Sequence, residues 1–355
     1  MTFEQVVGAA LEVLFLADIF LTVLYARAGT GLLAPRWNRA MWASLRGAAR
    51  LSGGRRGAVL SLGGPLIVIS LIGFWSLGLT VGAALVIHPE LGTAIRPSSG
   101  EASTDFVTAL LVAGNSLSIV GGGDYSPHTT GTRLLYLLHS LIGSSVLSLV
   151  LSYLVQVYSA LRERNALALT VHLMTGSTGE AAQMLARLAP DGDCSNASSE
   201  LGNLARSLAA TKEAHHFYPL LFYFRFEEPL YAVSRFSFVL LDLVTLIETA
   251  LDQTHCASLV RSGPVTSLRD GTLLLLDMLS QSFPVASSPN DTSETSHLRR
   301  SYAAATDTLA RAGVPTQGDG IESYVADRRT WEPRVERVAP ALGYTMDEID
   351  RRSSR

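Results

Sequence analysis

The sequence predicts an all-α membrane protein, and three observations support this. Hydrophobic residues make up 48% of the 355 residues and charged residues only 17%. Two apolar segments, residues 66–87 and 134–157, are as long as the roughly 20 residues that a helix needs to cross a bilayer. After residue 165, apolar residues recur at the i, i+3, i+4 spacing of soluble helices, and no region is rich in strand-forming residues. The chain therefore divides into a membrane half and a helical soluble half.

A third apolar segment, residues 6–25, opens the chain. It lacks a basic n-region and carries Glu12 and Asp18, so it is interpreted as an extra transmembrane helix and not as a signal peptide. A carboxylate near the centre of a span costs about 2.5–3.5 kcal/mol on insertion scales. We therefore expect both acids to be hydrogen-bonded against neighbouring helices; a proton-sensing role is the alternative.

Charge predicts the topology. Between residues 25 and 58 there is no acidic residue but there are seven arginines, Arg27, Arg36, Arg39, Arg46, Arg50, Arg55 and Arg56. The positive-inside rule places this segment in the cytoplasm, which puts the N-terminus outside a cell membrane and the C-terminal half inside. Within it, residues 35–51 form a basic amphipathic pattern that suits a membrane interface, or else a helix packed on the cytoplasmic domain.

A glycine-rich stretch, residues 115–127, lies between the second and third spans. It follows the short apolar segment 106–112, which cannot cross a bilayer. Bare backbone at membrane depth is tolerated only where it is buried in protein or lines an aqueous path. Rings of backbone carbonyls can replace the hydration shell of an ion. The pattern therefore predicts a re-entrant helix followed by backbone that lines an ion path.

This stretch resembles the pore loop of the two-transmembrane, one-pore-loop potassium channels, whose filter reads Thr-Val-Gly-Tyr-Gly-Asp with a proline three residues on. The filter register is occupied by Ile119, Val120, Gly121, Gly122, Gly123 and Asp124, and Pro127 follows in place. Gly143 matches the family's hinge glycine in the inner helix. Asn115, where some members have a glutamate, and Ser118 are expected to support the filter. The resemblance covers residues 66–160.

The resemblance implies a tetrameric pore-loop channel that binds K⁺ at the filter carbonyls of Ile119, Val120, Gly121 and Gly122, with no other cofactor. Counted from Gly143, the family register turns an apolar stripe toward the pore axis as a possible dewetting gate. Its members are Leu147, Leu151 and Val155. A serine stripe at residues 144, 148 and 152 is the rival lining, and helix-contact roles are favoured for it.

Two departures from the family motif weaken the expected preference for potassium. Ile119 has no hydroxyl to form the innermost ion site, and Gly122 has no ring to brace the filter. A weakly selective Na⁺/K⁺ channel and a non-conducting membrane sensor are the alternatives. No nucleophile–base arrangement or metal-ligand spacing indicates an enzyme, and a net charge of −3 does not suggest a nucleic-acid partner.

The expected domains are residues 1–57, the extra helix with the basic segment; 58–160, the pore domain; and 161–355, a helical regulatory domain. Helical patterns in the last run over residues 178–188, 196–211, 230–251, 268–283 and 296–312. The aromatic stretch around His215 and His216 is expected to be a core with ion pairs, or alternatively a pocket for an unknown ligand. Cys194 and Cys256 are solitary, with no CxxC or Cys/His ligand spacing, so neither a disulfide framework nor a zinc site is expected.

Overall fold

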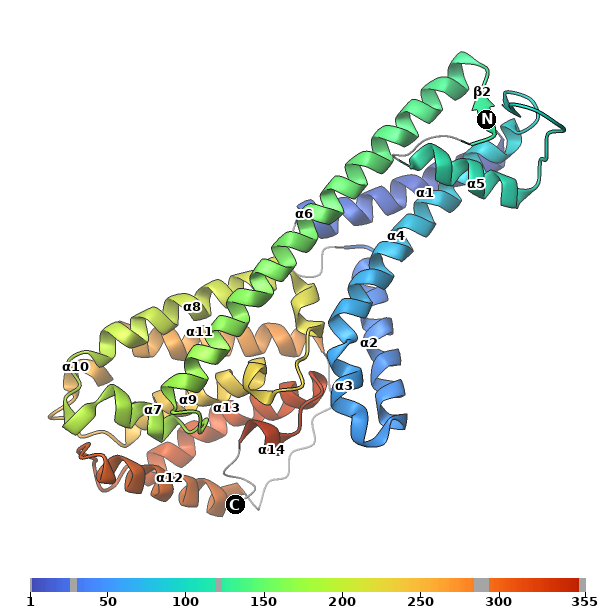
Figure 1. Cartoon of the computed structure of the whole chain (residues 1–355). Coiled ribbons are helices and arrows are strands. Elements are labelled where there is room, and N and C mark those ends of the chain that lie inside the picture. Colours follow the sequence, from blue (N-terminus) through green and yellow to red (C-terminus); the bar gives the residue numbers. More distant parts are fainter. Residues whose placement is uncertain (1, 26–30, 119–122, 284–293, 351–355) are drawn as a thin grey trace. The chain divides into compact units, whose positions relative to one another are not determined.

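The computed structural model describes residues 2–25, 31–118, 123–283 and 294–350 (Figure 1). The chain separates into two compact units. The membrane unit consists of Met1–Ser44 with Pro65–Tyr158, and the C-terminal unit of Leu45–Gly64 with Ser159–Arg355. This division groups the N-terminal helix with the pore helices, whereas the sequence analysis placed a boundary between them at residue 57.

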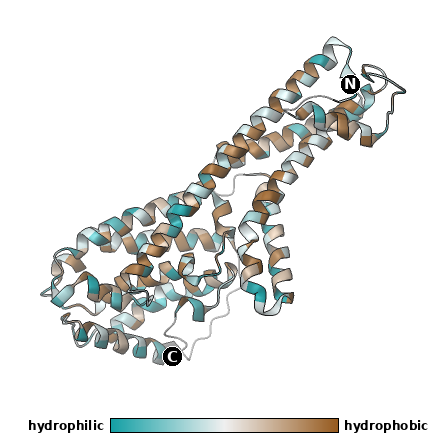
Figure 2. Cartoon of the chain, in the orientation of Figure 1, coloured by the Kyte–Doolittle hydropathy of each residue, from teal (hydrophilic) through white to brown (hydrophobic). Residues whose placement is uncertain are grey.

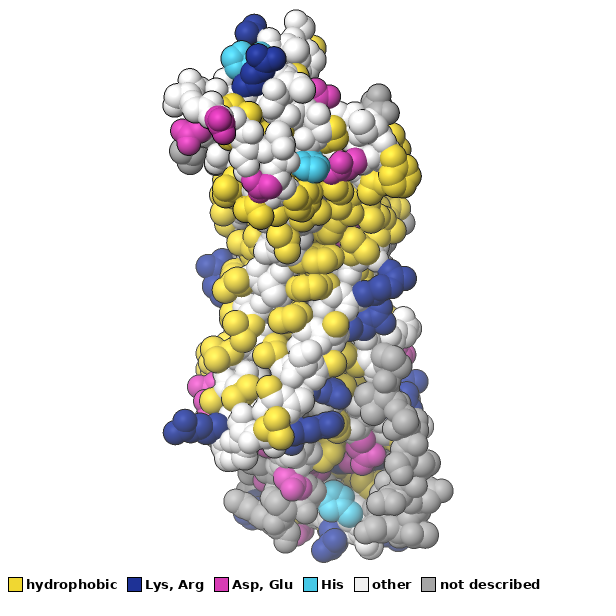
Figure 3. Space-filling view, turned by 90° about the vertical axis from the view of Figure 1, so that its right-hand side faces the viewer, with side chains coloured by type: hydrophobic (Ala, Val, Ile, Leu, Met, Phe, Trp, Pro, Cys, Tyr) yellow, Lys and Arg dark blue, Asp and Glu magenta, His cyan; other side chains and the backbone are white. Residues whose placement is uncertain are grey.

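The membrane unit contains three helices that are long and apolar enough to cross a membrane, as predicted. These are α1 (Phe3–Ile19), continued by a π-helical turn over Phe20–Leu24; α4 (Gly63–Ile87); and α6 (Thr130–Met174), whose residues from Ser159 onward belong to the C-terminal unit. Between α4 and α6 lies the shorter apolar helix α5 (Phe106–Leu117). Figure 2 shows hydrophobic residues along all four helices. In Figure 3 a band of hydrophobic side chains covers these helices, with acidic and histidine side chains at its upper margin.

Small residues bring α1 and α4 close together. A Cβ added to Gly78 would lie 2.1 Å from the ring of Phe15, and one added to Gly8 would lie 2.6 Å from the carbonyl oxygen of Gly82. Space of this kind lets two helix backbones approach in lipid. Gly78 and Gly82, four residues apart on α4, therefore leave the space in which α1 packs directly against the second span.

A small cap joins α4 to α5. In it β1 (Ile95–Pro97) pairs antiparallel with β2 (Tyr125–Pro127), a short sheet that the sequence did not predict. Apolar residues of the cap continue the core of the helices, with Leu91 and Ile95 buried in the same cluster as Ala109 and Val112 of α5. The loop that follows the pore helix is thus hydrogen-bonded to the segment that precedes it.

The C-terminal unit is all-helical over its described residues, as predicted. After α2 (Ala34–Leu51), which runs from one unit into the other, its helices are α3 (Arg56–Ser61), α7 (Ala181–Leu188), α8 (Ala197–Phe217), α9 (Val233–Thr249), α10 (Ala257–Val260), α11 (Gly263–Ser282), α12 (Glu294–Arg311), α13 (Ile321–Ala341) and α14 (Met346–Ile349). Helix α9 is buried at nearly every position and forms the centre of the unit, so it is a core helix and not a span.

Helix α13 was not among the predicted helices. It contains Pro333 and Pro340, and proline inside a helix removes a backbone donor and usually breaks the pattern. Packing stabilises it nevertheless, because Tyr324, Trp331 and Val335 on one face are all buried. Tertiary burial therefore outweighs the local cost of the two prolines.

A fully buried cation anchors α13 to α9. Nη1 of Arg328 lies 3.0 Å from Oδ1 of Asp242, and Nη2 lies 2.5 Å from Oε1 of Glu332. The hydroxyl of Tyr324 donates to the same Asp242 oxygen at 2.6 Å, and the guanidinium stands 5.0 Å from the ring centroid of Trp331. Because each charge has partners, the cost of burying the network is offset.

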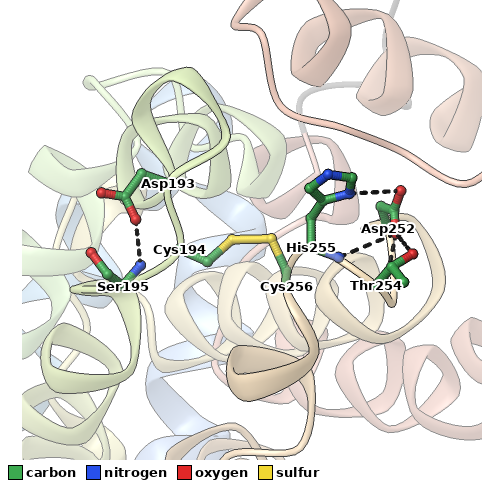
Figure 4. The surroundings of a disulfide bond; sticks show 7 residues. All are labelled: Asp193, Cys194, Ser195, Asp252, Thr254, His255 and Cys256. Carbon is green, nitrogen blue, oxygen red and sulfur yellow. Dashed lines mark hydrogen bonds and ion pairs between the residues drawn. A yellow bond between two sulfur atoms is a disulfide. The ribbon is translucent and has the colours of Figure 1, made fainter.

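The expectation that the two cysteines are solitary is wrong. Cys194 and Cys256 form a disulfide, with their Cα atoms 5.8 Å apart across 62 residues of sequence (Figure 4). Each lies in a turn shaped by a carboxylate: Asp193 accepts from the N–H of Ser195, and Asp252 accepts from that of Thr254. These hydrogen bonds lower the pKa of both carboxyl groups. The pairing depends on tertiary folding and leaves no spacing signal in the sequence.

Candidate functional site: the pore loop

The pore helix α5 begins at an acidic N-cap. Oδ1 of Asp105 accepts the N–H of Thr108 at 2.9 Å, which satisfies one of the donors left free at a helix start. Hydrogen bonds from the hydroxyl of Ser103 and from the backbone and hydroxyl of Thr108 hold the pKa of Asp105 well below its usual value. Asp105 is therefore a carboxylate at neutral pH, and it fixes where the pore helix starts.

The helix ends at Leu117, and its C-cap residue, Ser118, has an extended backbone and donates its N–H to the carbonyls of Gly114 and Asn115. The four predicted filter positions that follow, Ile119, Val120, Gly121 and Gly122, lie outside the described residues. The structure does describe the residues on either side of these four, Ser118 and Gly123.

Gly123 is held against the pore helix. Its φ of +142° falls in a region that side chains rarely adopt, and a Cβ there would lie 2.7 Å from Nδ2 of Asn115. Both backbone conformation and space therefore require glycine. The next residue, Asp124, is exposed, and its carbonyl accepts the N–H of Ser98 at 2.5 Å and its hydroxyl at 3.1 Å. The loop exit is thus tied to α5 on one side and to the cap on the other.

Gly143 is a point of close approach. Helix α6 continues through it without interruption, and a Cβ at this position would lie only 1.8 Å from the carbonyl oxygen of Leu117. The structure therefore gives this glycine a packing role between the third span and the end of the pore helix. Its role as a hinge stays a prediction.

The expected gate residues are largely exposed in the single chain: Leu147 by 44%, Leu151 by 54% and Val155 by 68%. The rival serines at positions 148 and 152 are exposed as well. Ser144 donates to the backbone carbonyls of Ser140 and Leu141. Which stripe lines a pore stays a prediction.

Both intramembrane acids of α1 have partners inside the membrane unit. Asp18 is fully buried and accepts the N–H of Leu33 at 2.7 Å, the N–H of Ala34 and the indole N–H of Trp75 at 2.8 Å. This is the structural role that was expected of it. Glu12 points to a different helix: its Oε1 lies 3.2 Å from Nε2 of His139 on α6.

His139 and Ser116 were not among the predicted site residues. Nδ1 of His139 lies 3.0 Å from Oγ of Ser116 on the pore helix, and both side chains are buried. A histidine within a membrane span is rare enough to count as a functional candidate by itself. That signal was present in the sequence, because His139 falls within the apolar segment 134–157.

The aromatic region of the C-terminal unit is a packed core. His215 is fully buried, its Nδ1 bonds to the carbonyl of Thr211 at 2.8 Å, and its ring stacks on Phe222. Burial and the nearby charge of Arg164 lower the pKa of His215 to about 3, so the ring is neutral. The cavity beside Arg225 holds only about 10 Å³, room for one water molecule. The expected core with ion pairs is present, and this cavity is too small for the alternative, a ligand pocket.

One comparison with known proteins gave a match. Residues 67–160, about a quarter of the chain, match a protein family described as an ion channel. Neither a curated protein nor a solved structure was found to match. The matched residues run from early in α4 through α5 and the loop to the middle of α6, which are the elements that the pore-loop resemblance requires. Residues 67–160 are therefore similar to the two-transmembrane, one-pore-loop channel family, and the N-terminal helix and the C-terminal helical unit lie outside the match.

Proposed function

We propose that this protein is a homotetrameric, potassium-type cation channel in the cell membrane. The observation that carries the proposal is the close approach of Gly123 to the side chain of Asn115, which sets the loop exit against the C-terminal part of the pore helix. Four copies of the loop would surround one axis, since a ring of carbonyls cannot come from a single chain.

A hollow beside the loop supports assembly. A cavity of about 700 Å³ opens between α5, the loop exit and α6, and its lining includes Asn115, Ser118, Asp124 and Tyr136. In a tetramer the neighbouring subunit would cover it. The exposed Leu151 and its neighbours on α6 would then face the axis as the gate, because an apolar constriction closes by dewetting.

Charge supports a cation as the permeant ion. The segment before the pore helix carries Glu90, Glu101 and Asp105 against Arg96, and Asp124 is exposed at the loop exit. Acidic groups around a mouth raise the local concentration of cations. The C-terminal end of α5, with its partial negative charge, precedes the filter directly.

From the arginine-rich segment and the positive-inside rule we infer a cytoplasmic C-terminal unit. Cytosolic thiols are kept reduced. Cys194 and Cys256 are therefore expected to be thiols in the cell and to form their disulfide when oxidised. Treating intact cells first with a membrane-impermeant thiol reagent and then with a permeant one tests the orientation and the redox state together. Cytoplasmic thiols should react only with the permeant reagent. Labelling by the impermeant reagent would contradict the orientation.

Ion flux into liposomes tests the function. Protein reconstituted under opposed potassium and sodium gradients should pass potassium faster than sodium, by a smaller factor than the full family motif gives. Gly123→Ala should abolish flux, because it breaks both the φ requirement and the Asn115 contact. Gly73→Ala is the matched control, since nothing lies within 4 Å of its Cβ position. Equal rates for both ions would favour the weakly selective alternative, and no flux would favour the non-conducting sensor.

A gate prediction follows from the same proposal. Leu151→Ser should raise resting conductance, because a polar side chain keeps an apolar constriction wet. Ser148→Ala serves as the control on the rival stripe. A larger effect at Ser148 would show that the other face lines the pore.

A further inference from the structure

Three polar side chains from three helices form a line inside the membrane unit. They are Glu12 on α1, His139 on α6 and Ser116 on α5. Nε2 of His139 lies 3.2 Å from Oε1 of Glu12, and Nδ1 lies 3.0 Å from Oγ of Ser116. The ring of His139 is fully buried, and the side chain of Glu12 is 13% exposed. The line connects the extra N-terminal helix to the pore helix through the inner helix.

The hydrogen bonds of Ser116 determine where the protons lie. Its Oγ is also 2.8 Å from the carbonyl oxygen of Ala113, which can only accept. A hydroxyl has one hydrogen, so Ser116 donates to Ala113 and its oxygen accepts a hydrogen bond from Nδ1 of His139. Nδ1 is therefore the protonated nitrogen on this side. On the other side of the ring, Nε2 faces Oε1 of Glu12 at 3.2 Å, a close polar contact without the geometry of a hydrogen bond.

Among the described residues of the helices packed around His139, no other ionisable group competes for its ring. Helices α4 and α5 carry no Asp, Glu, His, Lys, Arg or Tyr. On α1, Glu4 is paired with His88 and Asp18 is occupied by Trp75 and backbone N–H groups. On α6 the nearest titratable neighbour is Tyr136, three residues before the histidine.

Helix α4 leaves the space that directs Glu12. A Cβ at Gly82 would lie 2.8 Å from Cγ of Glu12, so any larger residue would displace the carboxylate. In this water-poor setting a hydrogen bond is stronger than in solvent, and an unpaired polar group is costly. The contact between Glu12 and His139 is therefore built by three helices together.

We propose that Glu12 and His139 are positioning residues for the selectivity filter. Glu12 packs its carboxyl group against Nε2 and so holds the His139 ring in position, and Nδ1–H of His139 holds the hydroxyl of Ser116. Ser116 is the residue after Asn115 and lies two residues before Ser118, so holding it holds the end of the pore helix. This inference rests on the proposed function, because the position of α5 affects permeation only if α5 supports a filter.

A double-mutant cycle on the sodium-to-potassium permeability ratio tests the proposal. Glu12→Met, Ser116→Ala and their combination are compared under bi-ionic conditions. Each single change should raise the ratio about threefold or more, the effect expected when one polar contact of this line is lost. The combined change should do no more than one alone, since both break the same line. Ser116→Thr, which keeps the hydroxyl, should restore the wild-type ratio.

Ser144→Ala is the control, because the Ser144 hydroxyl bonds only to backbone carbonyls of its own helix. It should leave the permeability ratio unchanged. Effects of Glu12→Met and Ser116→Ala that multiply independently would overturn the proposal, as would an equal effect of Ser144→Ala.

A second measurement does not depend on conduction. Nitrogen NMR of the full-length protein, labelled at histidine and reconstituted in bilayers, reports the protonation of each ring nitrogen. The His139 signals are assigned by their loss in His139→Gln. Nδ1 should carry a proton, and its resonance should shift in Ser116→Ala and in Glu12→Met. An unprotonated Nδ1 would overturn the proposal. If the protein passes no ions but Nδ1 behaves as expected, the positioning network stands and the proposed function has failed.

Discussion

The variant Gly143→Ala distinguishes between two explanations of why residue 143 is a glycine. The family resemblance makes Gly143 a hinge, whereas the structure makes it the place where α6 meets the pore helix. A Cβ at residue 143 would lie 1.8 Å from the carbonyl oxygen of Leu117, and ordinary contacts of a Cβ begin near 3.4 Å. The two helices must therefore separate by about 1.6 Å, the difference between those distances. Forcing an extra carbon into a packed contact costs about 1–3 kcal/mol.

The displaced atom belongs to the residue just before Ser118, so the strain reaches the start of the predicted filter. We expect Gly143→Ala to lower the thermal stability of the assembled protein and to weaken potassium selectivity, measured by calorimetry and by bi-ionic reversal potentials. Gly73→Ala provides the control, since its Cβ position is open. If Gly143→Ala leaves stability and selectivity intact and alters only the open fraction, the packing explanation is wrong and the hinge explanation is right.

Three further predictions concern the C-terminal unit. Burial lowers the pKa of His215 to about 3, so below about pH 6.5 the unfolded chain takes up a proton that the folded chain does not. The free energy of unfolding should therefore fall as the pH drops, by about 2 kcal/mol at pH 5. His215→Gln should flatten this pH dependence, measured by urea titration. Reducing the bond between Cys194 and Cys256, which are 62 residues apart, should cost up to about 4 kcal/mol in chain entropy, which unfolding with and without dithiothreitol measures. Asp242→Ala should cost about 3–5 kcal/mol in the same assay, because it removes a partner of the buried Arg328.

The sequence predicts the membrane half well because its signals are local. A span is a long apolar run, and a pore loop is a short apolar helix followed by glycines. Each can be recognised without knowing what packs against it. The register of Asn115 and Gly123 came from the same local stretch, and the structure places the two residues in contact.

What could not be predicted depends on residues far apart in the sequence. Cys194 and Cys256 give no signal until two turns meet. Helix α13 contains Pro333 and is stabilised by tertiary burial. The link from Glu12 to His139 joins helices that are more than one hundred residues apart. A carboxylate in a span indicates that a partner exists, but only the packing identifies it.

Polar side-chain contacts connect the N-terminal helix α1 to the rest of the membrane unit near both of its ends. Near its start, Oε1 of Glu4 lies 2.7 Å from Nδ1 of His88, which follows α4. Near its end, Asp18 accepts from the indole of Trp75 on α4 and from the backbone at the start of α2. A helix held only by lipid contacts would need neither acid, and hydrogen bonds to a charged group contribute about 1.5–3 kcal/mol each. These contacts offset much of the insertion cost of the acids.

Glu12 extends this argument to the pore helix. Asp18 and Glu4 hydrogen-bond α1 to α4 and its flanking segments. Such contacts could hold α1 in place without any influence on permeation. Glu12 instead contacts α6, and through His139 it reaches Ser116. A membrane protein that needed α1 only as an anchor would gain stability from an apolar residue at position 12, because a buried ionisable pair seldom stabilises more than well-packed apolar groups. The presence of a carboxylate where it costs most is therefore better explained by its effect on the pore helix than by stability.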